Sequence, residues 1–368
     1  MEISVKKGKI LLYRVFDIGS EIDLEKVEVL FEEKQLKERF KLDRKHNMSL
    51  FISRPPVAIQ LGAVEIKLVD KVVQAELLAK VWHFGTVSLC FQMPIEEGTA
   101  WGDLVKTANW IENDNEIEIF ARNKSKEFQH NIKDAIPVLN EWTIYEDYVT
   151  YFIQEFEGLD VPLSQLGEKV DIPSLILAET KEILSEATKK STLENTHQYS
   201  TDDLVVVDWN SALVVEKSGS MDVPLVIEFA LNQLLEMRYY DDLLDQRLNT
   251  LYSAVVGRKK GLWSNRYSNL AEEAGQIYLE ISEIIENVEN SFKTVGDFYL
   301  ATIFRASSKR FRFYDWQKSI NEKLGNLAEV SKLLHSEVNE SRNHVLEIVI
   351  IVLITIEVIP FLYNLMMN

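Results

Sequence analysis

Acidic side chains inside apolar stretches are the residues of this sequence that could do chemistry. Three of them, Glu228, Glu236 and Asp242, recur along a stretch with helical periodicity. Gathered carboxylate oxygens are the ligands that hard divalent cations prefer. The stretch contains no histidine, and its spacing singles out no particular metal. We weigh two interpretations: a divalent-ion site that could serve a metal-dependent enzyme, and a solvated or salt-bridged helix face.

A second pair of carboxylates lies in the apolar C-terminal segment. Residues 348–367 are almost wholly apolar, and a bilayer core needs about 20 such residues as a helix. Glu347 marks the start of the segment and Glu357 its middle, where Pro360 frees a backbone carbonyl. A charge at mid-membrane depth costs at least about 2.5 kcal/mol, so it indicates a function. Glu357 could be protonated and bonded to a neighbouring helix, could line a cation-conducting ring in an oligomer, or could stay near the surface.

Two clusters of basic residues stand out in a chain that is otherwise acidic. The first comprises Arg258, Lys259, Lys260, Trp263 and Arg266. Basic side chains beside a tryptophan are typical of the lipid headgroup zone, so we expect membrane contact there, with a solvated basic turn as the alternative. The second comprises Arg305, Lys309, Arg310 and Arg312. It could bind RNA, an acidic partner protein or the protein's own acidic face.

The elements that must position these residues fall into three predicted regions, which together make an α+β fold. Residues 1–220 predict a mixed α/β head, residues 221–344 a bundle of long helices, and residues 345–368 a transmembrane helix. In the head, β-branched runs predict strands and amphipathic runs predict helices. We expect strands at 9–16, 142–156 and 204–216, and two or three strands over residues 57–69 and 72–91 together, with a bulge or tight bend at Gly85. We expect helices at 23–36, 101–111, 117–136 and 172–187, and an exposed loop at 189–203.

The long helices carry apolar seams. From Leu270 to Val295, apolar residues follow alternating spacings of four and three, which is a heptad pattern. A less regular seam runs from Phe313 to Leu334. We expect an antiparallel hairpin over residues 268–344 with its tip near residues 296–310. Spacing alone leaves open whether the seams pair within one chain or between subunits.

Composition narrows the functional classes. The net charge of −18 argues against general binding to nucleic acid. A lone cysteine, Cys90, fits a reducing compartment and excludes a disulfide framework. The N-terminal residues lack the long apolar stretch of a signal peptide, so we expect a tail anchor with the bulk of the chain in the cytoplasm. The sequence holds no phosphate-binding glycine loop, nucleophile elbow or H-E-x-x-H motif, which favours a non-enzymatic protein without a cofactor.

Some motifs point to a known family. The helix at residues 316–324 reads WQKSINEKL, the tail carries Leu-Glu-Ile at 346–348 and Ile-Glu-Val at 356–358, and residues 82–87 read WHFGTV. In these motifs the chain resembles the "required for meiotic nuclear division" family, a group of membrane-anchored proteins from bacteria and mitochondria. It departs from that family's Ser- and Ala-rich middle helix. The mitochondrial members are linked to translation at the inner membrane, so the resemblance implies an anchor rather than an enzyme.

These observations predict a tail-anchored, oligomeric scaffold on the cytoplasmic membrane, with lipids as partners and a protein partner at the hairpin tip. The alternatives are an oligomeric pore or ion-responsive protein that uses Glu357, and a metal-dependent enzyme in the head.

Overall fold

The computed structural model describes residues 3–31, 36–37, 54–68, 71–139, 144–256, 265–292 and 298–367. Within these ranges, the description leaves out the side chains of residues 36–37, 254–256, 265–267, 280, 283–292, 337, 341–342, 357 and 360–367. The fold is α+β, as predicted. Its strands lie in the N-terminal part and its long helices in the C-terminal part.

The chain divides into two compact units. The first, which we call the sheet unit, contains residues 1–237 and 290–314; the second, the helix unit, contains residues 238–289 and 315–368. This division differs from the predicted boundary near residue 220. The first half of α7 (Asp222–Val256) and all of α9 (Phe298–Arg310) belong with the sheet rather than with the long helices.

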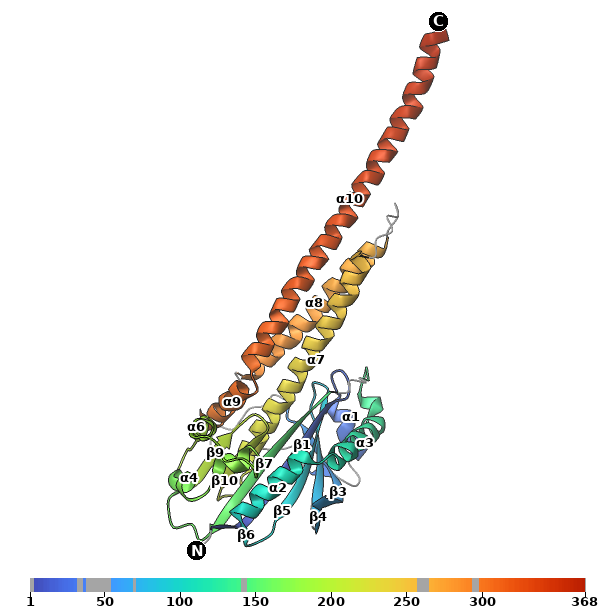
Figure 1. Ribbon diagram of the computed structural model, residues 1–368. Coiled ribbons are helices and arrows are strands. Elements are labelled where there is room, and N and C mark those ends of the chain that lie inside the picture. Colours follow the sequence, from blue (N-terminus) through green and yellow to red (C-terminus); the bar gives the residue numbers. More distant parts are fainter. Residues whose placement is uncertain are drawn as a thin grey trace. The chain divides into compact units, whose positions relative to one another are not determined.

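A single mixed sheet forms the centre of the sheet unit (Figure 1). Its strand order is β2-β3-β4-β5-β1-β7-β10-β9-β8, and β6 pairs with β1. Neighbouring strands are antiparallel except β7 and β10, which are parallel. The strands are β1 (Ser4–Asp17), β2 (Leu36–Lys37), β3 (Val57–Leu68), β4 (Lys71–Val81), β5 (Thr86–Ile95), β6 (Thr99–Ala100), β7 (Tyr145–Glu157), β8 (Thr196–His197), β9 (Asp203–Val207) and β10 (Ser211–Glu216).

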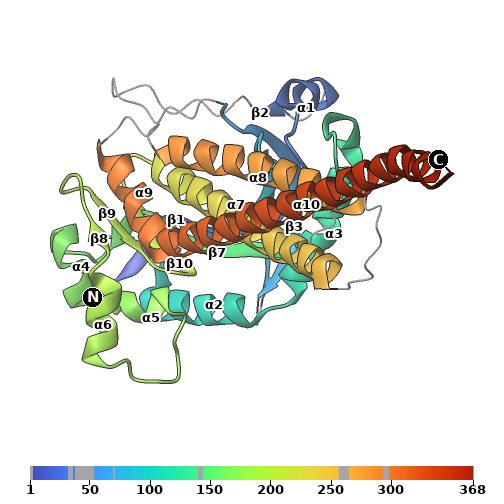
Figure 2. The same cartoon turned by 90° about the horizontal axis from the view of Figure 1, so that it is seen from above.

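The two faces of the sheet differ in character, because successive side chains of a strand point to opposite faces. One face is apolar: Leu12, Leu77, Leu89 and Phe91 belong to a core with α2 (Trp101–Asn113), α3 (Glu116–Asn131) and α5 (Ile172–Ile176). The other face is more polar and receives the first half of α7, which runs across it in Figure 2. The remaining short elements are α1 (Leu24–Phe31), η1 (Lys133–Ala135), η2 (Leu163–Gln165), α4 (Leu166–Lys169) and α6 (Glu186–Leu193).

Several predicted elements of the head are confirmed, and the bend at Gly85 is one of them. Its φ is 114°, and it closes a tight turn in which the Trp82 amide donates to the Thr86 carbonyl. An added Cβ at Gly85 would lie 2.1 Å from the Gly19 carbonyl oxygen, so glycine alone fits this turn.

Other predicted elements are wrong. The helix expected at 172–187 ends at Ile176, because Ala178 adopts a left-handed φ of 51°. The strand expected at 204–216 is a hairpin, which turns where the Asp208 amide donates to the Ser211 carbonyl. The loop expected at 189–203 contains the end of α6 and the whole of β8. The helix expected at 23–36 is α1 as far as Phe31, the next four residues lie outside the described residues, and Leu36 belongs to β2 instead.

The helix unit packs three long helices by their apolar seams. It holds the second half of α7, most of α8 (Asn265–Phe292) and most of α10 (Phe313–Met367). The buried seam residues are Leu244, Leu248 and Leu251 of α7, Ala271, Ala274, Ile277 and Ile281 of α8, and Ile320, Leu324, Leu327, Val330 and Leu334 of α10. These side chains are buried within one chain, so this part of the seam pairs intramolecularly. Among the described residues, no helix combines the length and the apolar character needed to cross a bilayer.

Candidate functional site

A buried polar layer joins the sheet to the first half of α7. Lys80 of β4 donates to the Glu228 carboxylate of α7, and these side chains are 5% and 0% exposed. One turn further along α7, Asn232 Oδ1 accepts from Thr86 Oγ1 at 2.6 Å. Asn232 Nδ2 also donates to the Glu228 carbonyl at 2.7 Å, which ties the two helix residues together. The layer therefore holds α7 in one register over β4 and β5.

The sequence reasoning missed this ion pair. Its only signal is that each charge stands alone in an apolar run, Lys80 in LLAKV and Glu228 in VIEFAL. A lone charge in such a run is buried and needs a partner. The sequence gives no means of pairing two residues that lie 148 positions apart.

The polar layer offers no activated nucleophile. Burial, together with the nearby Glu228 carboxylate, raises the pKa of the Cys90 thiol to about 12, so the thiol stays protonated near neutral pH. Burial raises the pKa of Tyr13 well above its usual value. Two atoms of the layer, Ser88 Oγ and Glu228 Oε1, have no hydrogen-bond partner in the part of the chain that the structure describes.

The hypothesised divalent-ion site at Glu228, Glu236 and Asp242 finds no support among the described residues. They contain no group of three histidine, cysteine or acidic side chains placed to hold a metal ion. Glu228 is paired with Lys80, and Glu236 is buried in the sheet unit. Asp242 belongs to the helix unit.

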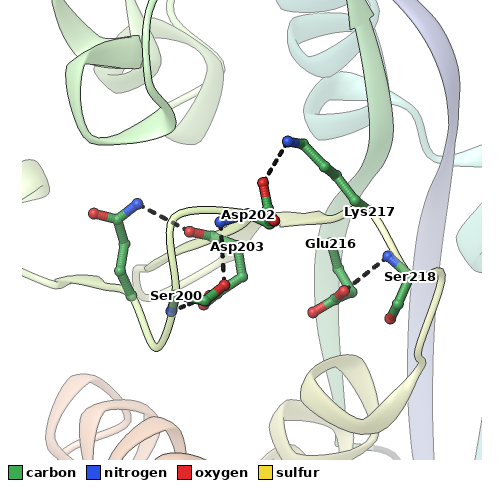
Figure 3. Close-up of polar contacts among 7 residues, drawn as sticks. Ser200, Asp202, Asp203, Glu216, Lys217 and Ser218 are labelled. Carbon is green, nitrogen blue, oxygen red and sulfur yellow. Dashed lines mark hydrogen bonds and ion pairs between the residues drawn. The ribbon is translucent and has the colours of Figure 1, made fainter.

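Helix α9 is fastened to the sheet at its first turn. Tyr299 Oη donates to Asp203 Oδ2 at 2.6 Å. Asp203 is the first residue of β9, and its carboxylate also accepts from the Ser200 amide and Ser200 Oγ (Figure 3). The Tyr199 amide donates to the same carboxylate at 2.9 Å. Burial alone would raise the pKa of Asp203, but these hydrogen bonds outweigh burial and the pKa lies below its usual value. Beside it, Lys217 donates to Asp202 at 2.5 Å.

The other end of α9 carries the second basic cluster, which divides into two parts. Arg310 is turned onto the sheet unit: it donates to the Ser191 carbonyl at 2.9 Å and lies 3.5 Å from Asp208 Oδ1. Phe311 follows it and packs edge-on against Tyr148 of β7, with 5.5 Å between ring centroids. Arg310 therefore pairs with Asp208 of the protein's own sheet unit. The side chains of Arg305, Lys309 and Arg312 are exposed.

Most of the predicted membrane-surface residues lie outside the described residues. This holds for Arg258, Lys259, Lys260 and Trp263, and for the side chains of Arg266, Glu357 and Pro360. Glu347 is described: its side chain is 69% exposed on α10, and its carboxylate lies 3.6 Å from His344 Nδ1.

The described end of α10 exposes an apolar surface on every side of the helix. From Ile348 to Ile359 the described side chains of isoleucine, valine and leucine are between 43% and 62% exposed. After Leu334, none of the described side chains of α10 is buried. Water is a poor environment for such a run, because a helix that is apolar all round is normally buried in protein or lipid.

Comparison with known proteins places the sheet in a family. A family described as "Uncharacterized protein MJ0711, N-terminal domain" matches residues 7–222, which include nearly the whole sheet and end where α7 begins. A relative, the "Uncharacterized protein MJ0711" of Methanocaldococcus jannaschii, is 25% identical over 218 residues, which are 58% of this chain and 65% of the relative. The matched part thus spans less than two thirds of that relative. No solved structure matches the chain.

The resemblance to the "required for meiotic nuclear division" family stays a prediction, because the motifs that carry it lie mainly beyond residue 222. The family match covers more than half of the sequence. The chain belongs to the family described as "Uncharacterized protein MJ0711, N-terminal domain".

Proposed function

We propose that this protein is a membrane-anchored, non-enzymatic scaffold on the cytoplasmic membrane, which self-associates and presents its sheet unit to the cytoplasm. The observation that carries the proposal is the exposed apolar run on α10 between Ile348 and Ile359. In the sequence this run continues to Met367.

The length of the run suits a bilayer. With a rise of about 1.5 Å per residue, residues 348–367 would extend about 30 Å as a helix, which is the thickness of a hydrocarbon core. Each isoleucine, valine or leucine near the centre of a bilayer contributes about −0.3 to −0.6 kcal/mol to insertion. The eight such residues at positions 348–356 therefore offset the cost of about 2.5 to 3.5 kcal/mol that an acidic residue such as Glu357 adds.

The polar stretch before the run supports the same assignment. Residues 335–347 read HSEVNESRNHVLE, and this stretch separates the last buried seam residue, Leu334, from the apolar run. The side chains with which α10 packs in the helix unit therefore end at Leu334, before the apolar run begins. The run is free to meet another apolar environment.

A scaffold rather than an enzyme is supported by the buried polar layer, whose charged and hydroxyl groups tie α7 to the sheet. Helix α10 begins with two residues of the sheet unit, Phe313 and Tyr314, and its remaining residues, the apolar run included, belong to the helix unit.

Vesicle flotation tests the anchor. The full chain and a chain truncated after Asn343 are mixed with vesicles of anionic and zwitterionic lipid and centrifuged through a density gradient. We expect the full chain to float and the truncated chain to stay at the bottom. Flotation of the truncated chain would refute the anchor.

A matched pair of substitutions on α10 separates membrane insertion from self-association in water. Ile351→Lys places a charge inside the apolar run, and Leu333→Lys places one at a site upstream that is 61% exposed. We expect Ile351→Lys to reduce flotation at least tenfold, because a lysine at the centre of a bilayer helix costs about 2.5 to 3.5 kcal/mol. Leu333→Lys should float normally. If neither the full chain nor the Leu333→Lys variant floats, and the full chain is an oligomer that stays in solution without detergent, the run is a protein interface and the proposal is wrong.

A further inference from the structure

A cavity of about 360 Å³ lies on the apolar side of the sheet, between β3 and the corner where α2 meets α3. Its floor is formed by buried side chains, Ile66 of β3, Phe91 of β5 and Ile117 of α3. Trp110 of α2 forms a wall, and Phe120 of α3, which is 42% exposed, stands at the opening. The volume is at the lower end of the range for small-molecule sites.

Three aromatic rings line this cavity. The rings of Phe91 and Phe120 meet edge to face, with centroids 5.9 Å apart and planes inclined at 64°. Trp110 adds a third ring. Aromatic faces carry negative electrostatic potential, so rings grouped around a cavity attract an ammonium group that has left water.

The charged residues at the cavity point to the same class of ligand. Three carboxylates line it, Glu65, Asp114 and Glu116, against a single cation, Lys67. One carboxylate oxygen of Asp114 caps α3 by accepting from the Ile117 amide at 2.9 Å. Glu116, in the first turn of α3, forms no ion pair with any residue that the structure describes. Three carboxylates and three aromatic rings in the lining of one cavity disfavour an anion and favour a cation with an apolar body.

We propose that this cavity is a binding site for a small organic cation, an alkyl- or arylammonium whose apolar part fills the space over Phe91 and Ile66 and whose ammonium group faces Phe120 and Glu116. The site is independent of membrane anchoring. It lies wholly within the sheet unit and within the residues that the family match covers.

Three probes of similar size test the proposal by calorimetry on the full chain in detergent: phenethylammonium, 2-phenylethanol and 3-phenylpropionate. We expect the cation to bind about tenfold more tightly than the alcohol, with an affinity that falls as salt is added. The anion should bind most weakly. Equal binding of all three probes, or a preference for the anion, would overturn the assignment.

Two variants locate the binding. Phe120→Ala removes the exposed ring without opening the buried core, and should reduce the preference for the cation. Glu116→Gln should weaken phenethylammonium severalfold and leave 2-phenylethanol unchanged. The matched control is Glu186→Gln, which changes an exposed glutamate in the first turn of α6, away from the cavity. If Phe120→Ala and Glu116→Gln both bind phenethylammonium as tightly as the control and the unsubstituted chain do, the probe binds elsewhere or to the detergent, and the proposal fails.

Discussion

The buried Lys80–Glu228 pair should behave unlike an ordinary surface ion pair. Both side chains are withdrawn from water, at 5% and 0% exposed, so neither charge can be solvated once its partner is removed. Glu228→Gln leaves a buried ammonium facing an amide, and Lys80→Met leaves a buried carboxylate facing a thioether. Breaking a buried pair in this way costs about 3 to 5 kcal/mol, most of which is the penalty for the stranded charge.

The double variant, Lys80→Met with Glu228→Gln, removes both charges and with them the penalty. We expect the double variant to recover most of the stability that either single variant loses, because no buried charge is left stranded and only the new amide lacks a partner, which costs about 1 to 3 kcal/mol. The coupling energy between the two sites should therefore be at least about 3 kcal/mol.

Hydrogen exchange of the amides in α7 between residues 223 and 237 is the appropriate assay. The chain has two compact units, so a single global unfolding energy is not well defined, whereas exchange reports the opening of this helix segment directly. We expect each single variant to lose most of the protection of this segment and the double variant to regain it.

The Lys6–Glu155 pair supplies the control. It joins β1 and β7 of the same sheet at 2.6 Å, but its side chains are 45% and 52% exposed. Glu155→Gln should change little, since water and salt screen such a pair. If Glu228→Gln is as harmless as Glu155→Gln, or if the double variant is as unstable as the single ones, the reasoning about a desolvated pair is refuted.

Two further predictions concern the sheet unit. Burial, aided by the positive charge of Arg54, lowers the pKa of His83 from 6.5 to about 4. The folded state therefore binds this proton more weakly than the unfolded state, and stability of at most about 3 kcal/mol should be lost as the pH falls from 6.5 towards 4. Hydrogen exchange of the β4 and β5 amides should show that the opening free energy depends less on pH in His83→Gln, and an identical dependence in both proteins would contradict the assignment. Tyr299→Phe removes the hydroxyl that donates to Asp203 and should cost about 1.5 to 3 kcal/mol of protection in α9, measured by hydrogen exchange. Tyr314→Phe, at a site that is 76% exposed, should have no effect, and equal effects of the two changes would count against a specific anchor.

Local patterns in the sequence were enough to predict most elements of the sheet unit. Weak alternation of apolar residues predicted β1, an apolar, β-branched run predicted β3, and Gly85 predicted the bend between β4 and β5. Predictions failed where a single backbone feature ended an element: the left-handed Ala178 stops α5, and the turn at Asp208 splits one expected strand into a hairpin. Such features depend on one or two residues, and averaging over a window of sequence hides them.

The apolar run of α10 and the seams of the long helices could be recognised from periodicity and composition, because both are properties of neighbouring residues. The burial of Glu228 against Lys80, the fastening of α9 by Asp203 and Arg310, and the cavity beside Phe91 come only from the tertiary structure. Each unites side chains from segments distant in the chain, and whether a charge is solvated, paired or stranded depends on what the fold brings against it. Properties that depend on residues adjacent in the chain can therefore be predicted from the sequence. Contacts between distant residues are decided by how α7 and α9 pack on the sheet.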